Sequence, residues 1–117
     1  MPDSDTAGNG KSLRQTMAQI YNKVNQEMYG IGVRQQKVER MDDKIIIFGK
    51  HQRVPALSVI EEKYPQLTLS VDTTLITEFK ERLQEEVYNQ LDLEVATILK
   101  DFDPKTEEAV AVIYLKR

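Results

Sequence analysis

The sequence contains no cysteine and no tryptophan, and it has a single histidine, His51. The absence of cysteine excludes disulfides, thiolate metal ligands and cysteine nucleophiles, and it suits a reducing compartment. One histidine cannot form a multi-histidine metal site within a chain. No run of residues approaches the roughly 18 apolar side chains that a membrane-spanning helix needs. We therefore expect a cytoplasmic protein without a membrane span, and we predict no bound cofactor.

What is present is ordinary for a globular domain. The chain has 117 residues, of which 40% are hydrophobic and 30% are charged. Residues 1–11 (MPDSDTAGNGK) have almost no apolar content, so we expect a disordered tail there. We expect residues 12–117 to form one α+β domain, because a chain of this length is the usual size of a single domain.

The charge of the chain is uneven. The net charge is −3, but residues 1–60 carry nine Lys/Arg against six Asp/Glu, and residues 61–117 carry seven against thirteen. Binding of phosphate backbones needs a concentrated basic surface, and the basic stretch of this chain has no interleaved aromatic residues for base stacking. The charge pattern therefore argues against nucleic acid as the main partner.

Hydrophobic periodicity predicts two main helices and four strands. Ser12 and Gln15 have the spacing of a capping box, an apolar stripe of helical period follows, and Gly30 suits the end of that helix. Strands are predicted over residues 30–41 and 44–50, and again over 93–102 and 108–115, each pair being a hairpin. A short helix is predicted from Pro55, stopped at Pro65, and a long helix begins near residue 72 or 73, with Ser70, Thr73 and Thr74 as capping residues.

These elements follow the order α-β-β-(α)-α-β-β and suggest an internal repeat. Leu13, Met17, Tyr21 and Val33 fall on Leu75, Phe79, Leu83 and Val95 at a spacing of 62 residues. Periodicity alone could produce this match, so true duplication stays open. The order predicts an antiparallel sheet of about four strands with two main helices on it. The strands are apolar on both faces, so we expect the second face to be covered by another copy in a homodimer.

No set of residues has the form of an active site. The acids are spread out rather than gathered in a tight loop, and no Ser or Thr has a base placed to activate it. His51 lies in a basic stretch that should lower its pKa; we expect an exposed loop histidine, with ligand contact or pH sensing as the alternative. We therefore predict that the protein is not an enzyme.

Six cations give the first hairpin a basic character: Arg34, Lys37, Arg40, Lys44, Lys50 and Arg53. A solvated strand face, a docking patch for an acidic protein or anionic membrane surface, nucleic acid and a small anionic ligand are the competing interpretations. Our hypothesis for partner binding names seven residues of this region: Gly30, Gly32, Arg34, Lys37, Arg40, His51 and Arg53.

Several segments resemble the MpsC-like family, which is named for a component of a Na⁺-translocating, membrane-potential-generating system. They are residues 29–33 (YGIGV), 42–47 (DDKIII), 55–56 (PA), 101–103 (DFD) and 110–115 (VAVIYL). The chain is similar to a divergent member of this family. The resemblance implies an accessory or regulatory protein linked to a membrane ion or inorganic-carbon transport system, peripheral to the membrane through a transporter subunit. It supplies no catalytic residues.

Two functions therefore stand at this point. The first is a non-catalytic interaction module, the soluble partner of such a transport system. The alternative is a dimeric small-molecule sensor with a pocket between the helices and the sheet or at the dimer interface.

Overall fold

The computed structural model describes residues 12–117, so the predicted tail, residues 1–11, lies outside the described residues. Helix α1 (Leu13–Tyr29) begins with the predicted capping box: the Ser12 hydroxyl accepts a hydrogen bond from the Gln15 amide at 3.1 Å, and Gln15 Oε1 accepts one from the Ser12 amide at 3.0 Å. The helix ends at Gly30, whose φ of 72° is left-handed and therefore favours glycine. The sequence signals at both ends are confirmed.

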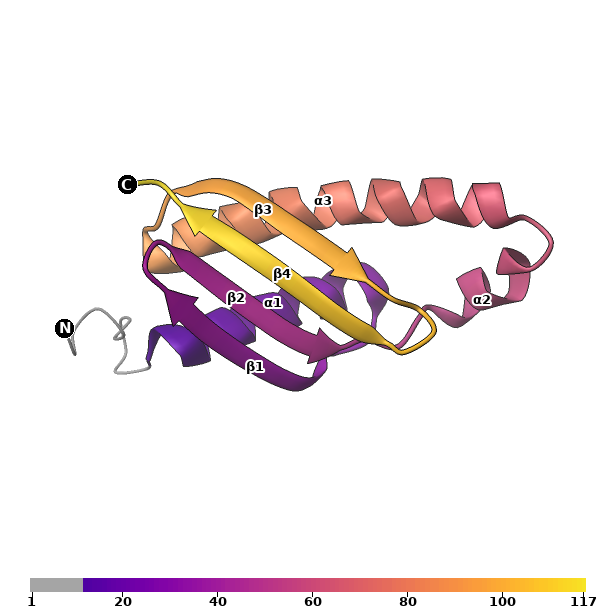
Figure 1. The fold of residues 1–117 in the computed structure, drawn as a ribbon, viewed down its shortest axis with the longest axis horizontal. Coiled ribbons are helices and arrows are strands. Elements are labelled where there is room, and N and C mark those ends of the chain that lie inside the picture. Colours follow the sequence, from indigo (N-terminus) through magenta and orange to yellow (C-terminus); the bar gives the residue numbers. More distant parts are fainter. Residues whose placement is uncertain (1–11) are drawn as a thin grey trace.

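Four strands form one antiparallel sheet. They are β1 (Arg34–Met41), β2 (Lys44–Lys50), β3 (Val95–Phe102) and β4 (Glu108–Leu115), in the spatial order β1-β2-β4-β3. Both predicted hairpins are present, and the two central strands pair with each other. Helices α1 and α3 (Pro65–Leu91) lie on the same face of this sheet (Figure 1). The α+β class and the predicted order of elements are confirmed.

The strand order has an approximate two-fold symmetry between the two α-β-β units. Each unit supplies one central strand and one edge strand, and the central strands pair antiparallel with Ile45 opposite Ile113 and Ile47 opposite Ala111. Both edge strands also carry a register shift near their start, between Arg34 and Lys37 in β1 and between Val95 and Thr97 in β3. Such bulges bend an edge strand and discourage pairing with another sheet.

The core lies between the helices and the inner face of the sheet. From α1 it contains Met17, Ile20 and Tyr21, and from α3 it contains Phe79 and Leu83, all at most 1% exposed. The sheet adds a row of aliphatic side chains from the inner face, namely Ile45, Ile47, Val95, Ile98, Ala111 and Ile113. Burial of these side chains is the main term that stabilises the fold, at roughly 1.5–3 kcal/mol for each large one.

Helix α3 starts earlier than predicted. We expected a helix from residue 72 or 73, but the helix begins at Pro65. Proline is tolerated at the first helical position because the backbone N–H that it lacks would have no hydrogen-bond partner within the helix. Ser70, Thr73 and Thr74 are interior residues of α3, not caps. The hydroxyls of Thr73 and Thr74 donate to the carbonyls four residues earlier at 2.9 Å. Pro65 therefore starts α3.

The early start of α3 creates an arm. Helix α2 (Pro55–Glu61) and the first part of α3, residues 65–74, extend past the end of the sheet where β3 turns into β4 (Figure 1). We call residues 55–74 the arm. It exposes several large apolar side chains, with exposed fractions between 53% and 78%: Val59, Tyr64, Leu67 and Leu69. None of the helices in residues 12–117 has the length and apolar content that would span a bilayer.

Candidate functional site

A pocket of about 90 Å³ lies where the arm joins the sheet. Its walls come from the end of α1 and the following loop, the segment between β2 and α2, the middle of α3 and the end of β3. Most of the wall is apolar and includes Ile31, Val54, Leu57, Leu75, Ile76 and Phe102. The polar groups in this wall come from segments far apart in the sequence, so the fold alone brings them together.

Lys100 brings an ammonium group into this apolar surrounding. It pairs in register with the buried Ala111, so its side chain points to the helix-covered face of the sheet. Its Nζ atom lies 4.4 Å from the ring centroid of Phe79 and donates a hydrogen bond of 2.9 Å to Tyr21 Oη. Burial lowers the pKa of Lys100 to about 8, although the charge of Asp101 acts against this shift. No described carboxylate forms an ion pair with Lys100.

The Tyr21 hydroxyl links Lys100 to His51. An ammonium group can only donate, so the Tyr21 oxygen accepts from Lys100, and its own proton is free to go to His51 Nε2 at 3.0 Å. When the hydroxyl donates to Nε2, the neutral imidazole carries its proton on Nδ1. Burial, and then the Lys100 charge, lower the pKa of His51 to about 3, while burial raises the pKa of Tyr21. Both rings are therefore neutral at neutral pH.

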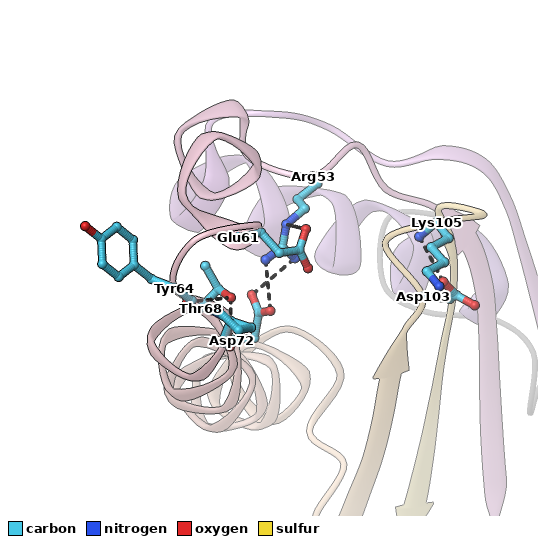
Figure 2. Close-up of polar contacts among 8 residues, drawn as sticks. Arg53, Glu61, Tyr64, Thr68, Asp72, Asp103 and Lys105 are labelled. Carbon is cyan, nitrogen blue, oxygen red and sulfur yellow. Dashed lines mark hydrogen bonds and ion pairs between the residues drawn. The ribbon is translucent and has the colours of Figure 1, made fainter.

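Arg53 ties the arm to the pocket. Its side chain is only 8% exposed, and its Nη2 atom lies 3.1 Å from Asp72 Oδ2 on α3. Its Nε atom is 3.6 Å from Glu61 Oε2 on α2, which is too long for a hydrogen bond. Figure 2 shows the guanidinium between these two carboxylates. One arginine from the segment after β2 thus joins both helices of the arm.

Two polar atoms of residues that line this pocket have no hydrogen-bond partner within the described chain. Asn25 is 1% exposed, and its amide nitrogen donates to the Tyr21 carbonyl at 2.7 Å, yet its Oδ1 atom is unpaired. Arg53 Nε is buried and also lacks a hydrogen bond. Buried polar atoms are nearly always satisfied in folded proteins, so such atoms at a pocket indicate a place for a ligand or water.

The charges of the pocket do not cancel. The carboxylates of Asp72 and Glu61 both lie beside Arg53, and His51 is neutral, so within the described residues Lys100 has no carboxylate paired with it. A pocket with one free cation, neutral hydrogen-bonding groups and apolar walls can hold and orient a small anion.

The structure separates the seven residues of the partner-binding hypothesis into three places. Gly30 and Gly32 shape the loop after α1: a Cβ atom on Gly32 would lie 2.9 Å from Asn22 Oδ1, the atom that accepts a hydrogen bond from the Val33 amide. His51 and Arg53 lie in the pocket. His51 is partly buried and hydrogen bonded, so the expectation of an exposed loop histidine is wrong, because the end of β2 carries it over Tyr21.

The other three residues lie on β1 and do not share a face. Lys37 pairs with Phe48 on the outer side of the sheet, whereas Arg40 pairs with Ile45 on the helix-covered side. Arg34 and Lys37 each form an ion pair with a glutamate, with most of both cationic side chains exposed. The basic hairpin is therefore not one continuous patch, and partner contact by these residues stays a prediction.

Sequence reasoning missed Lys100, Tyr21, Asn25 and Asp72 as site residues. One signal was available for Lys100, because it follows the core residue Ile98 by two positions and so falls on the same face of the strand. A lysine in an inward position of a strand suggests a buried charge. The other three residues look like ordinary members of helices, and only the fold shows that they meet.

The outer face of the sheet is uncovered by any described element. We call it the open sheet face; Met41, Leu99 and Phe48 are 59%, 53% and 43% exposed on it. Strand pairing places Ile46, Val110 and Val112 between them. Simple alternation along β3 would place Leu99 on the same face as Val95, but the register shift after Val95 turns Leu99 outward.

Comparisons with known proteins complete this description. Residues 9–117 match the family described as the Na⁺-translocating membrane potential-generating system (MpsC). No curated protein and no solved structure matches the chain.

Proposed function

This chain belongs to the MpsC family, and from that premise we propose that it is a non-catalytic accessory module that serves a membrane ion-translocating system as a homodimer. The open sheet face is the observation that carries this proposal. A contiguous apolar surface on a sheet is a common mark of a protein interface. The first partner that we assign to it is a second copy of the same chain.

The charges around the open sheet face favour this occupant. Register places four cations and one acid on the outer side of β1 and β2, namely Arg34, Lys37, Lys44, Lys50 and Glu39, a net charge of +3. The outer side of β3 and β4 carries Asp101 and Glu108, a net charge of −2. A two-fold axis parallel to the strands sets the basic edge of each sheet against the acidic edge of the other. Two sheets packed in this way would keep their strands nearly aligned.

Light scattering of the purified chain tests the dimer. We expect twice the chain mass at micromolar concentration, and we expect Phe48→Glu to give a monomer because it buries a charge at the centre of the interface. Leu67→Glu is the matched control, since Leu67 is 53% exposed but lies on the arm. A mass of one chain for the unaltered protein would overturn the homodimer, and dissociation by Leu67→Glu would move the interface to the arm.

Co-purification tests the accessory role. Tagged protein recovered from gently solubilised membranes should bring an integral membrane subunit of the translocating system, identified by mass spectrometry. Charge reversal at Arg34, Lys37 and Arg40 should abolish this recovery, whereas reversal of the distant Lys116 should not. Because Arg34 and Lys37 also lie on the open sheet face, light scattering of the same variant separates loss of the membrane subunit from loss of the dimer. Recovery that is independent of the three β1 cations would contradict their assignment, and absence of any such subunit would contradict the accessory role.

The pocket supports a second function, the sensing of a small molecule. The observation that favours it is that the pocket is lined both by Lys100, which has no ion pair within the described residues, and by Asn25, whose buried Oδ1 atom has no hydrogen bond there. Melting-temperature shifts on addition of small anions test this function, and no shift with any anion would contradict it.

A further inference from the structure

The ammonium group of Lys100 has N–H groups that form no hydrogen bond within the described residues. An ammonium carries three N–H groups, and a single hydrogen bond, to Tyr21 Oη, uses one of them. The ring centroid of Phe79 lies 4.4 Å from Nζ, so this ring stabilises the cation. Two donors remain for another acceptor. A carboxylate offers two oxygens to such donors and supplies the missing negative charge.

The charge balance of the pocket sets the charge of the ligand. Arg53 is already paired with Asp72 at 3.1 Å and with the half-exposed Glu61 at 3.6 Å, so among the described cations that line the pocket Lys100 is the one without an ion pair. A dianion such as phosphate would bring more negative charge into an apolar pocket than one cation neutralises. The pocket therefore suits a monoanion.

The walls and the volume of the pocket limit the polarity and the size of the uncharged part of the ligand. Side chains such as Val54, Leu75 and Ile76 offer no hydrogen bonds, so the part of the ligand beyond its charged end is apolar. The volume of about 90 Å³ is well below the roughly 300 Å³ at which pockets for drug-sized molecules begin. The ligand is accordingly a small metabolite rather than a lipid or a nucleotide.

We propose that this pocket binds a small monocarboxylate with a short apolar chain, and that Lys100 holds its carboxylate while the arm and the end of β3 enclose its chain. The proposal rests on the sensing function above and names its ligand class. The carboxylate takes the place of the counterion that Lys100 lacks, with the Tyr21–His51 pair holding the ammonium in position.

Titration of the full chain with sodium butyrate, monitored by NMR of the backbone amides, tests the proposal. Backbone amides around the pocket, those of Gly32, Gln52 and Phe102, should shift and saturate at up to ~20 mM butyrate, as expected for a Kd of about 1 mM. The uncharged analogue 1-butanol and the cation butylammonium should produce no saturable shift at these amides. Sodium bicarbonate is the anion without an apolar chain, and it should bind more weakly than butyrate.

A variant isolates the contribution of Lys100. Lys100→Met keeps the length of the side chain and removes the charge, so it should weaken butyrate binding at least tenfold. Lys116→Met is the matched control, because Lys116 is exposed at the other end of the sheet, and its affinity should equal that of the unaltered protein. If Lys100→Met does not fold, the comparison of butyrate with its uncharged and cationic analogues still decides the question.

Three results would overturn the proposal: no saturable shift with butyrate, equal binding by 1-butanol or bicarbonate, or unchanged affinity in Lys100→Met. Equal binding by bicarbonate would assign the pocket to inorganic anions in general. Failure of butyrate to bind leaves the dimer and the membrane partner untouched, because light scattering and co-purification measure those without any ligand.

Discussion

The ammonium group of Lys100 lies 2.9 Å from the hydroxyl oxygen of Tyr21, and this contact joins β3 to α1 across 79 residues of sequence. It places a cation at the edge of the core, beside the ring of Phe79. A buried cation is costly unless a counterion is present. Stability and ligand binding should therefore respond in opposite directions when Lys100 is changed.

Lys100→Met should raise the free energy of unfolding at pH 7 by about 1–3 kcal/mol, since it removes the cost of burying a charge and keeps the packing of the side chain. Chemical denaturation measures this change. Lys116→Met should leave stability within about 0.5 kcal/mol of the unaltered protein, as surface substitutions usually do. A loss of stability in Lys100→Met would show that its ring and hydroxyl contacts outweigh the desolvation of its charge.

The same residue should make stability depend on pH in the alkaline range. The pKa of Lys100 is about 8 in the folded protein against an ordinary 10.5, so the unfolded chain binds more protons between these values and stability rises with pH there. His51 stays neutral throughout this range. Tyr21 and Tyr29 have raised pKa values and oppose the rise above about pH 10, so the measurement belongs between pH 8 and 10. Denaturation of Lys100→Met over this range should give a flatter profile.

His51 should make the protein sensitive to acid. Its pKa is about 3 in the folded state against an ordinary 6.5, because burial and the charge of Lys100 disfavour the imidazolium. The unfolded chain then binds more protons between these values, so stability falls as the pH falls below 6.5. Asp43, with a pKa lowered to about 2 by Arg117 and Lys44, contributes only below about pH 4. Denaturation between pH 7 and 4 should show a smaller loss for His51→Gln, and an unchanged slope would contradict the assignment.

Asp72→Asn should loosen the arm. It leaves the guanidinium of Arg53, which is 8% exposed, without its nearer carboxylate. We expect a loss of about 1–3 kcal/mol and faster hydrogen exchange of the α2 amides. Glu78→Gln is the control, since it breaks an exposed pair with Arg82 and should cost less than about 0.5 kcal/mol. Equal exchange of α2 in both variants would show that Arg53 does not hold the arm.

Gly49 should tolerate no side chain. A Cβ atom there would lie 2.6 Å from Val33 Cγ1, so Gly49→Ala should destabilise the fold by about 1–3 kcal/mol through overpacking. Val33→Ala removes the clashing methyl, and the double variant should recover part of the loss relative to the sum of the single changes. Purely additive effects in thermal denaturation would indicate that the cost of Gly49→Ala comes from elsewhere.

Much of the fold follows from local signals in the sequence. The capping box at Ser12, the left-handed Gly30 and the apolar period of α1 each act within a few residues, so they could be recognised without knowledge of the fold. The two hairpins could be predicted for the same reason, since their strands and turns are also close together in the sequence. The start of α3 was misjudged because Pro65 is compatible both with the end of one helix and with the first turn of the next.

The site depends on contacts that local patterns cannot show. The register shift after Val95 reverses the faces of β3, which turns Leu99 outward and leaves Lys100 facing the helices. A single inserted residue has this effect because side chains alternate between the faces of a strand. The pairing of Arg53 with Asp72 likewise requires that the arm fold back on the segment after β2, which no periodicity encodes.

Helix α3 is anchored in the core by its C-terminal half, and its N-terminal part extends beyond the sheet (Figure 1). Its 27 residues form one uninterrupted helix of about 40 Å, of which Phe79, Leu83 and Val87 are fixed in the core. The pocket touches the helix at Leu75 and Ile76, just beyond this anchored part, and Pro65 lies about 16 Å farther along the axis. If α3 tilted about its anchored part, the displacement would be larger at Pro65 than at the pocket, so the exposed apolar side chains of the arm, Val59, Leu67 and Leu69, would move farthest.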